Sequence, residues 1–207
     1  MPTKRLEHLI DIGSAAGSSI GALVDVFERI TCVEANPDMA SALRRSVEAR
    51  GLSDKITVVE GVFPDVAAKL DVAQVINASN VAYNVSAIGP FLDAMDTLAR
   101  SLLVIELTGY HPLWSANGAF RHFYGIERPR TPTAIDLFSI IALEHPDATL
   151  ESYPLSYRRR PFSLSALRTR LGFDESRDGE LEAYLANAPL PHNPSMLITT
   201  RPRSSKP

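Results

Sequence analysis

The chain has 207 residues, of which 45% are hydrophobic and 22% charged, and its formal net charge is −3. This length suffices for one full hydrophobic core, so we expect a single domain over residues 1–201 followed by a disordered tail at 202–207. The acidic balance argues against a dedicated nucleic-acid surface. A single cysteine, Cys32, excludes an intrachain disulfide framework and a cysteine-based metal site.

The residues MPTKRLEH at the start contain no apolar segment of the kind found in secretory signals. No stretch approaches the ~20 apolar residues that a membrane-spanning helix needs. We therefore expect a cytoplasmic protein with no membrane partner. Repeats, an H-E-x-x-H motif and clustered histidines and aspartates are all absent from the sequence, so no metal is predicted.

A short apolar run at 9–12 leads into two closely spaced glycines, Gly13 and Gly17. Apolar residues at 20, 23, 24 and 27 then recur at the spacing of an amphipathic helix. Glycine accepts positive φ and lets a ligand approach the backbone closely, and the helix would direct its positive end at the turn. This order of strand, glycine turn and helix favours a nucleotide-like ligand, although α/β domains in general contain such turns.

The next apolar segment, residues 31–34, predicts a second buried strand that ends at Glu34. An acid at that point, about 20 residues beyond the glycine turn, can accept hydrogen bonds from both ribose hydroxyls. The alternative is an ordinary solvated acid at a strand end. The spacing also fits a nicotinamide dinucleotide domain, but Ala15 and Ser18 replace the second and third glycines of G-x-G-x-x-G.

These two segments, LIDIGSAAG and VEANPDMA, resemble motif I and the acidic loop of the class I S-adenosylmethionine-dependent methyltransferases. The similarity continues through ITVVEGVFPDV, NASNVAYNV and LLVIELTGYHPL, and covers about residues 9–113. Ala15 at the middle glycine of the motif is a departure from the family pattern. The resemblance implies a doubly wound, mostly parallel seven-stranded α/β sheet, with the last strand antiparallel at its edge.

The resemblance also implies S-adenosyl-L-methionine as the cofactor and assigns residues to its parts. Asp11 would fix the glycine loop and reach the methionine ammonium through water, Glu34 would hold the ribose, and Val62 or Phe63 would pack on the adenine. Phe63 could equally be a core aromatic. The complete set of implied cofactor-binding residues is Asp11, Gly13, Ser14, Ala15, Gly17, Glu34, Ala35, Gly61, Val62, Phe63, Asn77 and Ala78.

Further elements follow from periodicity, capping and turn signals. We expect strands at 56–59, 72–77, 102–107, 149–157 and 196–200. We expect helices at 38–50, 66–70, 88–101, 114–124, 133–143, 164–171 and 179–187.

Three polar residues are candidates for orienting or activating a methyl acceptor. Asn80 and Tyr83 follow the strand at 72–77, where an open α/β sheet places its ligand crevice. They could instead be a helix cap and a packing residue. His111 follows the strand at 102–107 and could act as a general base, or could be a hydrogen-bonding loop residue.

The aromatic-rich segment 114–124 predicts an inserted helix near 113–125 that roofs the acceptor pocket. Trp114, Phe120, Phe123 and Tyr124 would line that pocket, and the competing interpretation is a packing helix without substrate contact. Only about eight residues precede the first strand, where the family usually carries helices, so we expect an open site that a homodimer helps to cover. The basic run 158–160 is a solvated strand end or, alternatively, an anion-binding patch.

The function predicted from the sequence is methyl transfer from S-adenosylmethionine to a small-molecule acceptor. Three alternatives stay open at this point. They are a non-enzymatic protein that reuses the fold to bind partners, a nicotinamide-dinucleotide-binding protein, and an RNA methyltransferase.

Overall fold

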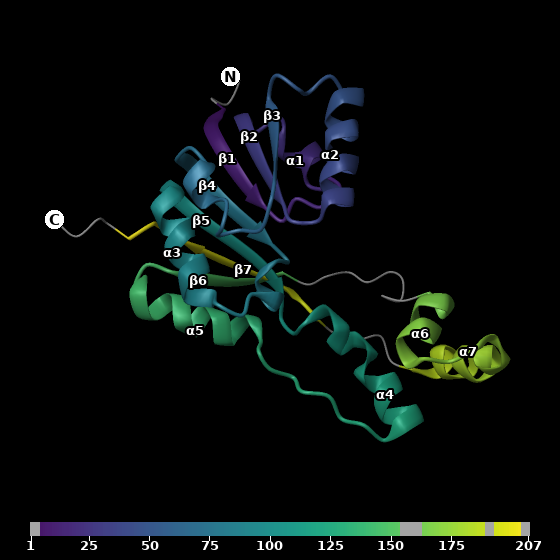
Figure 1. Cartoon of the computed structure of the whole chain (residues 1–207). Coiled ribbons are helices and arrows are strands. Elements are labelled where there is room, and N and C mark those ends of the chain that lie inside the picture. Colours follow the sequence, from purple (N-terminus) through teal and green to yellow (C-terminus); the bar gives the residue numbers. More distant parts are fainter. Residues whose placement is uncertain (1–4, 154–162, 189–192, 204–207) are drawn as a thin grey trace. The chain divides into compact units, whose positions relative to one another are not determined.

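The computed structural model describes residues 5–153, 163–188 and 193–203 (Figure 1). The chain divides into two compact units. Unit 1 comprises residues 1–107, 138–151 and 197–207, and unit 2 comprises residues 108–137 and 152–196. Among the described residues, no helix combines the length and the apolar character that crossing a bilayer requires.

The sheet has seven strands in the order β3-β2-β1-β4-β5-β7-β6, and helices flank it. The first five strands pair in parallel, and β7 is antiparallel. This is the predicted Rossmann-like α/β arrangement. The strands are β1 (Leu6–Ile12), β2 (Phe27–Glu34), β3 (Ile56–Glu60), β4 (Ala73–Ser79), β5 (Ala99–Thr108), β6 (Thr149–Tyr153) and β7 (Ser195–Thr200).

The last strand does not lie at the edge of the sheet, so that part of the prediction is wrong. β7 lies between β5 and β6, which leaves β6 as the edge strand. The burial of the two strands agrees with this order, because most residues of β7 are buried whereas most of β6 are exposed. A central strand is covered on both faces and therefore carries more buried side chains than an edge strand.

The expected amphipathic helix after the glycine turn is also wrong. α1 (Ile20–Leu23) has a single turn, and Phe27 begins β2 instead of continuing the helix. Phe27 is buried in a cluster with Leu9 and Ile30, so its burial reflects its place in the strand. Four residues are too few to build up a useful helix dipole, so this helix supplies no positive end to the turn.

The second helix, α2 (Pro37–Ala49), begins and ends close to the predicted positions. Asn36 accepts backbone hydrogen bonds from Asp38 and Met39 and thereby caps the helix, and Pro37 takes the first helical position. Ala40, Leu43 and Val47 form the buried face of the helix, whereas Met39 is exposed.

The remaining helices of the sheet region lie near their predicted positions. α3 (Ile88–Leu98) ends three residues earlier than expected, because the backbone becomes extended at Ala99, where β5 begins. The chain also forms α5 (Ala134–Glu144). The segment expected to be a helix at 66–70 contains only a short 3-10 turn, η1 (Ala67–Lys69).

Unit 2 contains more than the insertion expected at 113–125. It includes the 3-10 helix η3 (Pro112–Ala116), α4 (Asn117–Tyr124), α6 (Leu164–Leu171), a 3-10 turn η4 (Glu175–Arg177) and α7 (Asp178–Asn187). These elements share a core of their own. Its buried members are Ala116, Ala119, Leu167, Leu171 and Leu181. A separate core explains why these segments group apart from the sheet.

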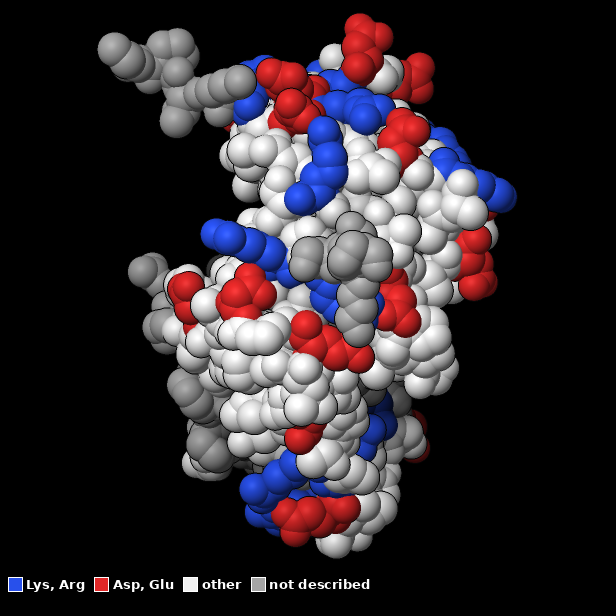
Figure 2. Space-filling view, turned by 90° about the vertical axis from the view of Figure 1, so that its left-hand side faces the viewer, with Lys and Arg blue, Asp and Glu red and all other residues white. Residues whose placement is uncertain are grey.

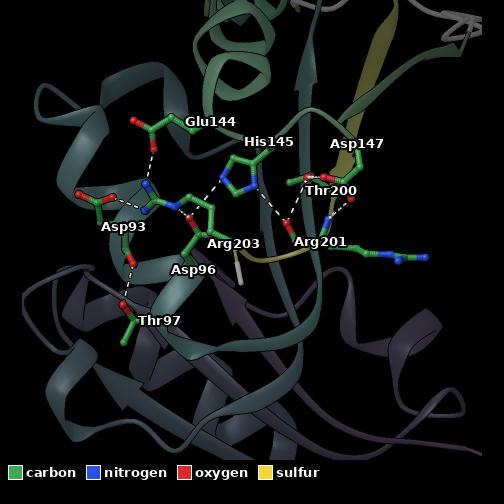
Figure 3. Close-up of polar contacts among 9 residues, drawn as sticks. All are labelled: Asp93, Asp96, Thr97, Glu144, His145, Asp147, Thr200, Arg201 and Arg203. Carbon is green, nitrogen blue, oxygen red and sulfur yellow. Dashed lines mark hydrogen bonds and ion pairs between the residues drawn. The ribbon is translucent and has the colours of Figure 1, made fainter. Parts of the chain in front are cut away.

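Residues 202 and 203 belong to the predicted disordered tail, but the structure shows that they are anchored. Arg203 forms ion pairs with Asp93, Asp96 and Glu144, which come from α3 and α5 (Figure 3). The side chain of Asp96 is only 7% exposed and also contacts His145 at 3.2 Å. The sequence offered no local signal for this contact, because its partners lie far from residue 203 in the chain. Residues 204–207 are outside the described part.

Candidate functional site

The loop between β1 and α1 has positive φ at three of the predicted cofactor-binding positions. The φ angles are 74° at Gly13, 48° at Ala15 and 89° at Gly17. A Cβ on Gly13 would lie 2.3 Å from Cγ2 of Val81, and one on Gly17 would lie 2.6 Å from Leu43. Both positions therefore require glycine for its backbone conformation and for close packing. The contact with Val81 joins this loop to the segment that follows β4.

Ala15 adopts positive φ although it carries a side chain, which costs an ordinary residue about 1 kcal/mol or more. Its backbone N–H donates to Oε2 of Glu34 at 2.7 Å. A hydrogen bond to a charged acceptor offsets a cost of this size. The departure from the family's glycine pattern is thus accommodated by the acid at the end of the neighbouring strand.

Glu34 ends β2 as predicted, and only 9% of the residue is exposed. Its Oε1 accepts the backbone N–H of Asn36 at 2.8 Å, while Oε2 accepts that of Ala15. Each carboxylate oxygen has two lone pairs, so each retains one for a further donor. Ala35, another predicted cofactor residue, stands between Glu34 and Asn36 in the sequence and is exposed.

Asp11, near the end of β1, lies at the centre of a polar network. Its Oδ1 accepts from the amide of Asn77 at 2.6 Å, and its Oδ2 accepts from the hydroxyls of Ser14 at 2.8 Å and Ser19 at 3.3 Å. Burial raises the pKa of the Asp11 carboxyl, and the hydrogen bonds from Asn77, Ser14 and Ser19 oppose that rise. The network links β1 to β4, where the strand order of the sheet reverses.

The loop after β3 carries the residues predicted to lie along the adenine. The N–H of Gly61 donates to the carbonyl of Glu34 at 2.9 Å, which fixes the loop beside β2. Phe63 is buried and packs edge-on against Phe91, with ring centroids 5.1 Å apart. Val62 is 55% exposed. Phe63 is therefore a core aromatic, and Val62 is the side chain of this pair that is accessible to a ligand.

Asn80 and Tyr83 interact with each other after the end of β4. The Tyr83 hydroxyl donates to Oδ1 of Asn80 at 3.1 Å, and the N–H of Asn80 donates to the carbonyl of Glu106 at 2.7 Å. Asn80 has a φ of 59° and does not cap the following turn, η2 (Ala82–Asn84), whose N-cap is Val81. Ala78, within β4, is fully buried and presents no side chain to a ligand.

His111 belongs to unit 2 and caps η3. Its Nδ1 accepts the backbone N–H of Leu113 at 3.1 Å. Burial and the neighbouring Arg128 lower the pKa of the imidazole. In this arrangement the neutral ring carries its proton on Nε2, and the lone pair of Nδ1 is used by the cap. Action as a general base would require this hydrogen bond to open.

The aromatic side chains of α4 pack against other rings of unit 2. The Phe123 ring lies 5.2 Å from that of Phe173 and 5.4 Å from that of Tyr184. Tyr124 packs on Phe173, and its hydroxyl donates to the carbonyl of Leu171. Of the four residues expected to line a pocket, Trp114 and Phe123 each line a cavity within unit 2. The cavity of Trp114 is described below.

Three features of the site escaped the sequence interpretation. Asn36 caps α2 from the position directly before a proline, a signal that capping rules could have identified. Ser19 and Val81 reach Asp11 and Gly13 only through tertiary folding. Within the part of the chain that the structure describes, no group of three or more His, Cys, Asp or Glu side chains could hold a metal. The basic run 158–160 lies outside the described residues.

The comparisons place this architecture among known folds. The chain is similar in structure to the YcgJ protein from Bacillus subtilis, with a TM-score of 0.61, 14% identity, and coverage of 99% of this chain and 95% of that one. It is similar to a putative methyltransferase from Bacillus halodurans, with a TM-score of 0.61, 12% identity, and coverage of 97% and 94%. It is also similar to an O-methyltransferase from Bacillus cereus in complex with SAH, with a TM-score of 0.56, 12% identity, and coverage of 94% of this chain and 73% of that one.

These likenesses identify the fold as that of the class I S-adenosylmethionine-dependent methyltransferases, and they confirm at that level the resemblance seen in the sequence. No family model matches the chain. A segment of 56 residues is 38% identical to a probable ribosomal RNA small subunit methyltransferase A from Haloarcula marismortui. The matched segment makes up 27% of this chain and 20% of the archaeal protein.

Proposed function

We propose that this chain binds S-adenosylmethionine and transfers its methyl group to a small-molecule acceptor. The arrangement of Glu34 and the glycine loop carries this proposal. A buried carboxylate ends β2, held by the N–H of Ala15 from the loop, and each of its oxygens retains a lone pair. Ribose hydroxyls are donors that match those lone pairs.

The position of this arrangement in the sheet supports the same ligand. The strand order reverses between β1 and β4, and ligands of open α/β sheets bind outside the carboxyl ends of the strands at such a point. Asp11 and Asn77 meet across these two strands, and Glu34 ends the next strand over. Val62, exposed after β3, is available to cover an adenine.

When bound, S-adenosylmethionine supplies a methyl group that is already activated as a sulfonium. The chain's own residues then mainly bind, orient and exclude water. Asp11 and its partners fix the glycine loop, and Glu34 holds the ribose. Asn80 and Tyr83, joined by a hydrogen bond after β4, orient the acceptor.

Calorimetric titration of S-adenosylmethionine, S-adenosylhomocysteine and NAD into the wild type, Glu34→Ala and Glu60→Ala tests the proposal. Glu60 is a matched control, because it is the register partner of Glu34 at the end of β3 and pairs with Arg44 in an exposed salt bridge. We expect the first two ligands to bind, NAD to be silent, and Glu34→Ala alone to lose binding. Circular dichroism confirms that each variant is folded.

Failure of both S-adenosyl ligands to bind the folded wild type would refute the enzyme proposal and favour a protein that reuses the fold to bind partners. Binding of NAD alone would favour the dinucleotide alternative. If Glu34→Ala bound the S-adenosyl ligands as tightly as the wild type, Glu34 would not contribute to their binding.

An RNA acceptor is a second candidate, because the archaeal protein with the matching 56-residue segment is described as an rRNA methyltransferase. The face shown in Figure 2 has basic and acidic side chains interspersed, without one extended basic surface among its described residues. The test is RNA binding by the wild type and by a variant with glutamine at positions 158–160. Tight binding that this variant loses would favour RNA over a small molecule.

A further inference from the structure

A cavity of about 250 Å³ lies wholly within unit 2. Three segments form it: η3 with the start of α4, the loop 125–133, and α7. Its lining residues are Trp114, Ser115, Asn117, Gly118, Arg121, Glu127, Arg130 and Tyr184. The volume lies just below the range of about 300–1,000 Å³ that is typical of ligand sites, which suits a molecule about the size of a single substituted ring.

The charge of this cavity favours an anion. Arg121 and Arg130 both pair with Oε1 of Glu127, at 3.4 Å in the case of Arg130. Two guanidinium groups thus share one carboxylate, which leaves an excess of one positive charge. Arginine presents several N–H donors in a planar fork, and this geometry matches a carboxylate.

The loop that carries Glu127 and Arg130 is held in place from both sides. The guanidinium of Arg128 lies over the ring of Phe120, 4.9 Å from its centroid, and the Arg128 carbonyl accepts from the amide of Asn117 at 3.5 Å. At the far end of the loop, Thr133 forms a β-bridge with Tyr110. The wall opposite is fixed by Ala116 and Ala119 in the core of unit 2. The cavity is therefore preformed rather than assembled by its ligand.

Two further groups define the chemistry of the ligand. Trp114, stacked on Tyr110 with centroids 4.6 Å apart, contributes aromatic surface, as does Tyr184. Oδ1 of Asn117 is buried and has no hydrogen-bond partner among the described residues. A buried acceptor without a donor is costly, so a ligand hydroxyl or amino group that reaches it would be favoured.

We propose that this cavity binds a small aromatic carboxylate that also carries a hydroxyl or amino group. The carboxylate pairs with Arg121 and Arg130, and the ring lies against Trp114. The proposal concerns ligand binding in unit 2 alone and goes beyond the proposed methyl transfer. The binding site itself does not depend on that function.

Trp114 is the chain's single tryptophan, so its fluorescence reports on this cavity. The experiment titrates benzoate, and separately its neutral isostere benzamide, into the full chain. We expect a saturable change in emission with benzoate and a response at least about tenfold weaker with benzamide. The double variant Arg121→Gln/Arg130→Gln should lose the benzoate response by a similar factor. Arg170→Gln, an exposed arginine of α6 outside the lining, should retain it.

Hydroxybenzoate tests whether a ligand hydroxyl donates to Oδ1 of Asn117. We expect it to bind more tightly than benzoate in the wild type, and the advantage to disappear in Asn117→Leu. Calorimetry measures this step, because hydroxybenzoates absorb near the tryptophan band. Thermal unfolding of every variant checks that the fold persists.

Equal responses to benzoate and benzamide, no saturable response to either, or equal losses in Arg170→Gln and the double variant would overturn the proposal. S-adenosylmethionine titration in the same samples separates the two proposals. Benzoate binding without cofactor binding would support the cavity proposal and refute the methyltransferase proposal. Cofactor binding without benzoate binding would support the methyltransferase proposal and refute the cavity proposal.

Discussion

The amide of Asn77 donates a hydrogen bond to Oδ1 of Asp11 at 2.6 Å, across the strands between which the order of the sheet reverses. This contact is a direct polar link between the side chains of β1 and β4 at the candidate site. Burial disfavours the charged form of Asp11, and the donor from Asn77 makes the largest contribution among the three hydrogen bonds that oppose this effect.

Asn77→Asp should therefore destabilise the protein by about 2 kcal/mol or more, since it replaces a donor with a second carboxyl beside Asp11. It should also weaken S-adenosylmethionine binding, because Asp11 orders the glycine loop. Urea denaturation and calorimetry measure the two effects. Gln74→Glu is the control: it makes the same chemical change on β4, and the side-chain oxygen that accepts the N–H of Glu7 is kept. Equal stability of the two variants would contradict the role of Asn77.

The thiol of Cys32 should be nearly inert in the folded protein. Burial, together with the nearby Asp11, raises its pKa to about 12, and the side chain is fully buried in β2. Since it is the chain's only cysteine, labelling with a disulfide reagent at pH 8 reports on opening of the sheet alone. We expect labelling to be slow without denaturant and to accelerate through the unfolding transition. Rapid labelling of the native protein would show that β2 is accessible.

His8 should make stability fall as the pH is lowered. It is buried, and its Nε2 lies 2.8 Å from the Thr31 hydroxyl. Its burial lowers its pKa most, and the positive charge of Arg29 lowers the pKa further. The unfolded chain then binds a proton near the ordinary pKa of about 6.5, before the folded protein does. Stability attributable to His8 is complete above that pH and is lost as the pH falls from about 6.5 through the lowered folded-state pKa.

Urea midpoints of the wild type and His8→Gln across this range provide the measurement. The difference between them should change with pH below about 6.5 and be constant above it. His122→Gln, an exposed histidine of α4, serves as the control and should follow the wild type. A constant difference across the whole range would mean that His8 does not titrate between the two states.

Arg203→Gln should destabilise the protein by about 1 to 2 kcal/mol. It removes one partner of the buried Asp96, and the magnitude is limited because Arg203 is partly exposed and screened. Arg201→Gln makes the same charge change two residues away, and the Arg201 side chain points away from Asp96 (Figure 3). It should leave the urea midpoint nearly unchanged. Similar losses in both variants would indicate a general charge effect instead.

Much of the sheet could be predicted from the sequence, because buried parallel strands appear as short, mainly apolar segments, as at residues 31–34 and 102–107. The failures have physical causes. Phe27 fitted a helical spacing by chance, and its burial comes from strand packing. The place of β7 between β5 and β6 is a long-range pairing that local patterns do not encode.

At the candidate site, Glu34 and Gly13 lie where strand-end and turn chemistry predicted them, and their roles toward a cofactor remain predictions. The role of His111 could not be predicted, because a histidine at this position suits both a catalytic base and a loop cap. The hydrogen bond from the backbone N–H of Leu113 depends on how the loop folds. Sequence likewise showed that Phe63 was aromatic but not which neighbour it would pack against.

The close packing of Val81 against Gly13 has a kinetic consequence. The segment that carries Asn80 and Tyr83 lies directly on the glycine loop, so neither can shift without displacing the other. A ligand that settles the glycine loop therefore also settles the residues proposed to face the acceptor. Because such coupling is reciprocal, each bound reactant should raise the affinity for the other and slow its release.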